Sequence, residues 1–224
     1  MQRSYPGYFI TLEGDDGCGK TSHIPQLVEY LRERGLTVFP TREPGGTSIG
    51  EQIRDVIHDI KNIEMYPRTE TLMYQAARAQ IVEQVIKPRL IAGEVVICDR
   101  YFDSTIAYQG YGHEQNLDRV MPLIQYATEG LVPDTTVLLD VDVEIGQKRK
   151  KGNSEWNRLD AFTWEFHERV KAGYLEMAKK DPARWIVIDA NRTIDVIYVD
   201  LKREIENRLI FNGFLEGDHK GIER

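Results

Sequence analysis

The segment of residues 8–21 reads YFITLEGDDGCGKT and largely decides the fold of this chain. Its first part, Tyr8–Glu13, is rich in β-forming residues and ends at a glycine, as a strand does before a turn. Its second part, residues 14–21, fits the pattern GxxxxGKS/T of a loop that binds phosphate. Such a loop must follow a strand and open a helix. We therefore predict a strand, a phosphate loop and a helix in succession.

The loop residues suit a nucleoside triphosphate. Glycines let the backbone wrap closely around phosphate oxygens, with N–H groups pointing inward at the start of the helix. Lys20 is expected to reach the β- and γ-phosphates, and Thr21 is expected to ligate Mg²⁺. The alternative is an ordinary glycine-rich turn, but burying a lysine there without an anion would be costly. The predicted ATP-binding residues are Gly14, Asp15, Asp16, Gly17, Cys18, Gly19, Lys20 and Thr21.

Strands and helices alternate along the rest of the chain. Continuous apolar runs predict strands, and apolar stripes at helical spacing predict the helices between them. This alternation is typical of an α/β fold with a mainly parallel sheet. With the phosphate loop, it predicts a P-loop NTPase fold, a five-stranded parallel sheet flanked by helices on both faces. The expected strands are 8–13, 37–41, 95–99, 136–141 and 185–190, and the expected helices include 49–60, 68–87, 161–180 and 194–209.

The composition is that of an ordinary globular protein and excludes several classes. The 224 residues carry 29 Lys or Arg and 36 Asp or Glu, a formal net charge of −7 that argues against nucleic-acid or anionic-membrane partners. Cys18 and Cys98 form no CxxC pair, and the histidines show no metal-ligand spacing, which disfavours a disulfide framework and a zinc site. No apolar run approaches the roughly 20 residues of a membrane span. With no signal peptide visible, we expect a cytoplasmic protein.

An acidic residue is expected beside the phosphate loop. Asp99 ends the predicted strand 95–99 and so lies at the carboxyl edge of the sheet, where open α/β proteins bind ligands. One interpretation is that it holds Mg²⁺, directly or through water, as a Walker-B acid does; the other is that it caps the next helix. Arg100 would be an unusual neighbour for a cap but a good clamp for a second phosphate.

Two further segments point to a second ligand. TREPGGT at residues 41–47 follows the second strand, and its proline and glycines predict an unusual turn that begins near Arg42. In LMYQAAR at residues 72–78, Tyr74 and Arg78 share one helix face, so a ring and a guanidinium could take a base and its phosphate together. Taken alone, the first could be a surface loop and the second a core tyrosine beside a solvated arginine.

Together, five segments resemble the thymidylate kinase family, whose members phosphorylate dTMP. TREPGGT and the pattern DRY…S…AYQG are specific to this family, whereas the phosphate loop alone is not. The resemblance covers about residues 8–190 and implies the reaction Mg²⁺·ATP + dTMP → ADP + dTDP, for dTTP synthesis. We expect one kinase domain over residues 1–212, followed by a frayed tail over 213–224, because this last segment is mostly polar and contains glycine. The segments are GDDGCGKT at 14–21, TREPGGT at 41–47, LMYQAAR at 72–78, DRYFDSTIAYQG at 99–110 and NRLDAF at 157–162.

The resemblance also implies roles for single residues. Asp16 matches an acid that touches the sugar hydroxyl of the acceptor, and Arg42 and Arg100 match arginines that grip its 5′-phosphate. Tyr74 matches an aromatic residue that stacks on the thymine, and Arg78 matches an arginine that reaches the base carbonyl. Ser104 and Thr105 match small polar residues near the base, and Tyr108 and Gln109 match residues that close over the nucleoside.

Family members carry a catalytic arginine either in the phosphate loop or in a flexible lid. The loop here has no arginine, so the chain resembles the lid-arginine kind, with a lid over about residues 148–160. The run KRKKGN at 148–153 contains glycine and asparagine, which favour the mobility that a lid needs. Because lysine outnumbers arginine there, Arg149 and Arg158 both stay candidates for contacting the transferred phosphoryl group, and a solvated charged turn is the alternative. The expected catalytic residues are Lys20, Arg42, Asp99, Arg100, Arg149 and Arg158.

The rival functions are a kinase for dUMP or another nucleoside monophosphate, and a P-loop ATPase or switch protein without an acceptor. Two arginines for the acceptor phosphate favour a monophosphate over a nucleoside. Selectivity for thymine cannot be predicted, because one methyl group is worth only about 1–3 kcal/mol. ATP and dTMP are the expected partners, without nucleic acid or membrane. The resemblance implies a homodimer built by helix packing, but does not indicate which helix.

Overall fold

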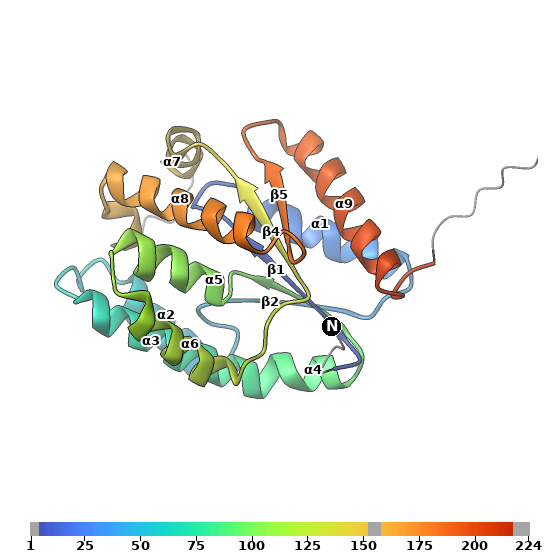
Figure 1. The fold of residues 1–224 in the computed structure, drawn as a ribbon, viewed down its shortest axis with the longest axis horizontal. Helices are drawn as coiled ribbons and strands as arrows, with labels where there is room; N and C mark the ends of the chain where they lie inside the picture. The colour runs from blue at the N-terminus through green and yellow to red at the C-terminus, as the bar shows by residue number, and fades with distance from the viewer. Residues whose placement is uncertain (1–4, 152–157, 217–224) are drawn as a thin grey trace, which may run out of the picture.

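The computed structural model describes residues 5–151 and 158–216 of the chain, and its centre is a five-stranded sheet between two layers of helices (Figure 1). The strand order is β2-β3-β1-β4-β5, and every pair of neighbours is parallel. This confirms the predicted α/β architecture. The strands are β1 (Tyr8–Glu13), β2 (Val38–Arg42), β3 (Val95–Asp99), β4 (Thr135–Asp140) and β5 (Trp185–Asp189).

The strand order brings the two predicted phosphate-binding segments together. In β1 and β3, Leu12 lies opposite Asp99, and in β2 and β3, Arg42 lies opposite Asp99. The carboxyl ends of these three strands therefore meet at one edge, where the phosphate loop and the segment 41–47 also begin. Parallel α/β sheets bind ligands at this edge.

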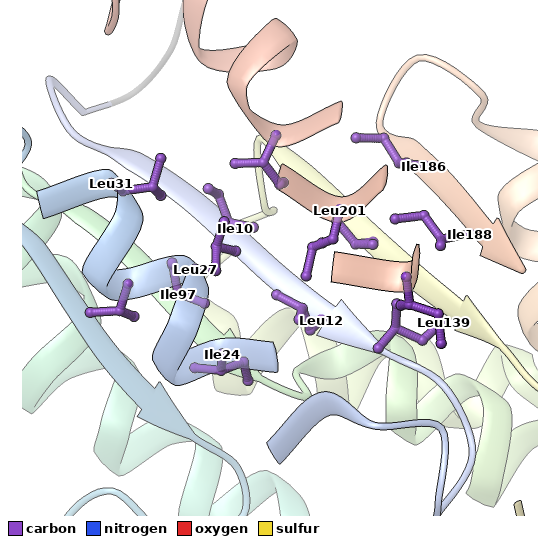
Figure 2. Packing of buried hydrophobic residues seen from close by; sticks show 14 of the residues in the cluster. Ile10, Leu12, Ile24, Leu27, Leu31, Ile97, Leu139, Ile186, Ile188 and Leu201 are labelled. Carbon is purple, nitrogen blue, oxygen red and sulfur yellow. The ribbon is translucent and has the colours of Figure 1, made fainter. Parts of the chain in front are cut away.

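Helices cover both faces of the sheet because alternate residues of each strand point to opposite sides. On one face, Ile10 and Leu12 of β1 pack against Ile24 and Leu27 of the helix after the phosphate loop and against Leu201 near the C-terminus (Figure 2). On the other face, Phe9 packs among residues of the helices that follow β2 and β3. The continuous apolar strands therefore correspond to a sheet buried on both faces.

The helices differ from the predictions at three places. The helix expected over 49–60 ends at His58, where Asp59 is already extended. The helix expected over 68–87 continues past Pro88. A π-helical turn (Val82–Ile86) precedes a short helix, Lys87–Ile91, and Pro88 lies in the first turn of that helix. A proline is tolerated there because the missing N–H is not needed for a helical hydrogen bond. The helix expected from residue 161 begins at Trp164, where Thr163 caps it and accepts a bond from Phe166 N. The helices are α1 (Lys20–Glu33), α2 (Ser48–His58), α3 (Pro67–Ile81), η1 (Val82–Ile86), α4 (Lys87–Ile91), α5 (Phe102–Thr105), η2 (Ile106–Gly112), α6 (Leu117–Thr128), α7 (Val143–Lys151), η3 (Arg158–Ala161), α8 (Trp164–Lys180) and α9 (Ile194–Phe211).

The first residues of the expected polar tail pack onto the domain. Phe214 and Leu215 lie against the core, and the ring centroids of Phe214 and Tyr8 are 5.0 Å apart. Residues 217–224 lie outside the described part of the chain. Within the described residues, no helix has the length and apolar character needed to span a bilayer.

Candidate active site

A cavity of about 760 Å³ lies at the carboxyl edge of the sheet, between the phosphate loop, the segment 41–47, α3 and the segment that follows β3. It brings together most of the residues that the sequence predicts for the site. Gly14, Asp15 and Arg158 do not line it. The predicted residues that do are Asp16, Gly17, Cys18, Gly19, Lys20, Thr21, Arg42, Tyr74, Arg78, Asp99, Arg100, Ser104, Thr105, Tyr108, Gln109 and Arg149.

The phosphate loop has the conformation that its glycines allow. Gly17 has a positive φ of 76°, and a Cβ there would lie 2.0 Å from the carbonyl oxygen of Gly146, so only glycine fits. The buried Lys20 donates from Nζ to the carbonyl of Gly14 at 3.0 Å. Because α1 begins at Lys20, its unpaired N–H groups and the positive end of its dipole face the loop. The arrangement is suited to binding a polyphosphate.

The two acids of the loop have different surroundings. Asp15 is buried and accepts a bond from the Tyr108 hydroxyl at 2.8 Å, and its other oxygen lies 3.0 Å from His167 Nδ1 on α8. Asp16 faces the cavity and pairs with Arg100 at 2.7 Å and with Lys150 at 2.8 Å. Burial would raise the pKa of Asp16, but the positive charges of Arg100 and Lys150 outweigh it and hold that pKa well below its usual range. Asp16 is therefore an ionised acceptor of hydrogen bonds.

Asp99 and the arginines beside it form the edge of the cavity. The following helix, α5, begins at Phe102 with Tyr101 at its N-cap position, so Asp99 does not cap it, and the alternative role considered for this acid is wrong. Arg42 pairs with Glu51 at 2.9 Å and is half-exposed at the cavity.

Arg100 is held inside the site by several partners. Its backbone has a positive φ of 69°, which is uncommon for a residue with a side chain. One terminal nitrogen lies 3.2 Å from Ser104 Oγ, and the other lies 3.1 Å from the Tyr108 hydroxyl. The guanidinium carbon also lies 5.0 Å from the centre of the Tyr108 ring. The side chain is therefore preorganised for an anion.

Arg78 lines the cavity, and its guanidinium also holds several protein groups together. Its side chain is 1% exposed and pairs with Glu43, whose Oε2 lies 2.6 Å from one terminal nitrogen. It also donates to Gln75 Oε1, to Thr105 Oγ1 and to the Tyr101 carbonyl. The guanidinium thus ties the segment 41–47 to α3, and contact with a base carbonyl requires one of these bonds to break. The interpretation of Arg78 as a solvated arginine is wrong.

The two lid arginines lie in different environments. Arg149 lines the cavity and donates to the carbonyls of Ala190 at 2.8 Å and Arg192 at 3.1 Å. Arg158 is buried, donates to the Ile57 carbonyl at 2.9 Å and forms an ion pair with the buried Glu70. Residues 152–157 of the expected lid lie outside the described residues. Of the two, Arg149 is the arginine that faces the ligand space.

Several cavity residues were missed by the sequence analysis. Arg54 and His58, four residues apart on α2, line the cavity, as do Glu43 and Lys150. Burial and the charge of Arg54 lower the pKa of His58 to about 3, so this imidazole is neutral at physiological pH. The spacing of Arg54 and His58 was a usable signal, since both fall on one helix face after TREPGGT.

The oxygen donors at the loop fit Mg²⁺. The Thr21 hydroxyl and the Asp99 carboxylate belong to side chains that line the same cavity, and Mg²⁺ prefers oxygen ligands. Within the described residues, no group of three or more His, Cys, Asp or Glu side chains could hold a metal. Thr21 and Asp99 are therefore two oxygen-bearing side chains that could contribute to an Mg²⁺ site shared with a nucleotide.

Comparison with known proteins agrees with this site. A sequence model of the family described as thymidylate kinase matches residues 12–200. The chain is 46% identical over 191 residues to a thymidylate kinase of Exiguobacterium, covering 85% of this chain and 90% of the relative. It is 45% identical over 205 residues to that of Halalkalibacterium halodurans, covering 91% and 98%. On these matches, the chain belongs to the thymidylate kinase family.

Proposed function

We propose that this chain transfers the γ-phosphoryl group of Mg²⁺·ATP to dTMP, giving ADP and dTDP, with both nucleotides held in the one cavity. As a member of its family, the chain is a nucleoside monophosphate kinase. The observation that carries the proposal is that Lys20 of the phosphate loop lines the same cavity as Arg100 and Tyr74.

On the donor side, the loop and the start of α1 would wrap the phosphates of ATP. Lys20 would leave the Gly14 carbonyl and move to the β- and γ-phosphates. A neutral carbonyl acceptor would thereby be replaced by charged phosphate oxygens. Thr21 and Asp99 would hold Mg²⁺, which would neutralise part of the negative charge of the donor's phosphates.

On the acceptor side, Arg42 and Arg100 would grip the 5′-phosphate, and Tyr74 would stack on the base. Asp16 is supported as the partner of the sugar hydroxyl because its ionised carboxylate can only accept hydrogen bonds. Lys150, which pairs with Asp16, would then be released toward the phosphates.

The chemistry needs positioning and positive charge more than a strong base. The second pKa of a phosphate monoester is about 6, so the acceptor is largely dianionic at neutral pH and can attack directly. Holding the two anions in line avoids much of the entropic barrier. Lys20, Arg42, Arg100 and Arg149 would spread the charge of the transition state.

ADP release from Mg²⁺·ATP, measured in parallel with dTMP, dUMP, dCMP, dGMP, dAMP, thymidine and no acceptor, tests the proposal. Release that depends on dTMP and exceeds that with dUMP would support it. Equal release in every reaction, including the one without acceptor, would make the chain an ATPase or switch protein. Preference for another monophosphate would reassign the acceptor.

Replacing Tyr74 by alanine is expected to raise the Kd for dTMP about tenfold or more, because base–aromatic stacking contributes about 1–3 kcal/mol per base. The Kd for ATP should change little. Isothermal titration calorimetry measures both constants, and Tyr74→Phe is the matched control because it keeps the ring. An unchanged Kd for dTMP in Tyr74→Ala would remove Tyr74 from the base site.

Replacing each of the two lid arginines by alanine is expected to produce two different defects. Arg149→Ala should lower kcat about 10²-fold with little loss of stability, since the side chain faces the cavity. Arg158→Ala should instead destabilise the fold by about 3–5 kcal/mol, because it leaves Glu70 buried without its ion pair. Turnover and thermal unfolding of both variants check this. A larger loss of kcat in Arg158→Ala, at a temperature where it is folded, would contradict the assignment.

We also propose that the chain forms a homodimer through the face made by α2, α3 and α6. The helices α2 and α3 pack together, as do α3 and α6, and these helices and their connection expose several large apolar side chains. Sedimentation velocity at micromolar concentration tests this, and a monomer would refute it. The exposed side chains on this face are Ile49, Val56, Leu72, Met121 and Tyr126, with Ile60, Ile63 and Tyr66 in the connection between α2 and α3.

A further inference from the structure

We propose that Glu13 is a positioning residue for phosphoryl transfer. It holds the Arg100 guanidinium in place through the hydroxyl groups of Ser104 and Tyr174. The inference rests on the proposed function, in which Arg100 grips the acceptor phosphate. Glu13 does not line the cavity and would not touch either nucleotide.

Glu13 is the last residue of β1, immediately before the phosphate loop, and its side chain is fully buried. A buried carboxyl group is costly unless hydrogen bonds compensate for the lost water. Burial and the charge of the nearby Asp103 raise the pKa of Glu13 to about 7, although Ser104, Arg100 and the Tyr101 N–H act in the opposite direction. The charge of Arg100 and the donors around Glu13 favour the carboxylate, the form in which this side chain accepts from all of them.

The hydrogen bonds of Glu13 have a definite direction. The Tyr101 N–H donates to Oε1 at 2.7 Å, and the hydroxyls of Ser104 and Tyr174 lie 2.6 and 2.9 Å from Oε2. Each hydroxyl has a single proton. The Ser104 and Tyr174 oxygens are 2.8 Å apart, so both hydroxyls can donate to Glu13, or one can donate to the other while that one donates to Glu13. In every arrangement the two protons lie between these three groups, and each hydroxyl oxygen keeps a lone pair for a further donor.

Arg100 lies on that opposite side. One of its terminal nitrogens donates to Ser104 Oγ at 3.2 Å and to the Tyr174 hydroxyl at 3.3 Å. Both hydroxyl oxygens can accept from the arginine because their own protons are engaged by the Glu13 carboxylate or by each other. The other terminal nitrogen is held by Asp16 and Tyr108. Glu13 therefore fixes one side of the Arg100 guanidinium. The backbone of Arg100 is itself in the left-handed region.

An amide cannot replace this carboxylate. If glutamine placed its NH₂ group where Oε2 lies, both hydroxyls would have to accept from it, and at least one of their two protons would have to turn to the side of Arg100. If it placed the NH₂ group where Oε1 lies, this group would face the Tyr101 N–H, donor against donor. Glu13→Gln is therefore nearly the same in shape but breaks the chain of bonds in either orientation.

The experiment compares wild type, Glu13→Gln, Tyr174→Phe and the double variant. We expect each single variant to raise the KM for dTMP about tenfold, since a hydrogen bond to a charged group is lost, with the KM for ATP unchanged. The KM for dTMP of the double variant should be little higher than that of the more impaired single variant, because both substitutions break the same series of hydrogen bonds. The Kd for thymidine, which lacks the phosphate that Arg100 grips, should stay unchanged in calorimetry.

Tyr8→Phe is the matched control, because it removes a buried tyrosine hydroxyl at the opposite end of β1, where it contacts Thr135. It should leave both KM values unchanged. Equal weakening of dTMP and thymidine in Glu13→Gln, additive losses in the double variant, or an unchanged KM for dTMP would each overturn the inference. If Glu13→Gln does not fold, Tyr174→Phe alone decides it by the same comparison of dTMP with thymidine. Wild type that releases no ADP with dTMP would instead refute the proposed function.

Discussion

Replacing Lys20 by alanine is expected to lower kcat about 10³-fold while the protein stays folded. The Lys20 side chain lies inside the turn of the phosphate loop, with Nζ 3.0 Å from the Gly14 carbonyl. In our proposal it moves onto the β- and γ-phosphates and stabilises the charge that develops during transfer. Removing one preorganised charge of this kind costs about 10²–10³ in rate, and more where a full positive charge is lost.

ADP release at saturating ATP and dTMP measures this effect, and thermal unfolding checks the fold. Lys87→Ala is the matched control, since Lys87 is a mostly buried, ion-paired lysine away from the cavity, 2.5 Å from Glu129. It should retain wild-type turnover. Near-normal activity in Lys20→Ala would mean that the loop does not hold the donor, and the cavity would need another ligand.

The second large effect is expected for Arg100→Lys, which should lower kcat/KM for dTMP about 10²-fold. Lysine keeps the charge but lacks the planar fork, so it cannot bind the acceptor phosphate with two parallel bonds. It also cannot reach Asp16, Ser104 and Tyr108 together, as the guanidinium does. Arginine and lysine both carry a Cβ, so the positive φ of 69° at this position disfavours both residues alike and does not explain a difference between them.

Arg89→Lys is a suitable control for Arg100→Lys. The Arg89 guanidinium also stacks on an aromatic ring, that of Phe39 at 4.3 Å, but it lies outside the cavity. Steady-state kinetics with dTMP should show a loss for Arg100→Lys only, and calorimetry with thymidine should show no difference between the variants. Loss of thymidine binding in Arg100→Lys would place Arg100 at the nucleoside rather than at its phosphate.

Much of the fold follows from local patterns. The strand Tyr8–Glu13 and the loop after it were predicted correctly because a continuous apolar run and a GxxxxGKT pattern each depend on neighbouring residues alone. The five strands were found within one residue at each end for the same reason. Pro88 misled the prediction, because a proline stops a helix only where its N–H would be needed, and the π-turn before it removed that need.

The resemblance also predicts which segments share one site. Asp99, Arg100 and Tyr74, which come from different segments, all line the cavity. Side-chain roles within the site were harder to predict. Arg78 lines the cavity as expected, but no local pattern indicates that protein acceptors also saturate its guanidinium. Arg158 is a lid candidate in the sequence but is buried against Glu70.

The sequence by itself therefore determined the sheet, the phosphate loop and the position of the site at the carboxyl edge. Only the tertiary structure decided which buried polar groups are paired. Glu13 meets Tyr174 across 161 residues of chain, and Asp15 meets His167 across 152. Periodicity records which face of an element is buried, because neighbouring residues share that element. The partner of a buried charge is instead set by how distant elements pack, and no local pattern encodes that contact.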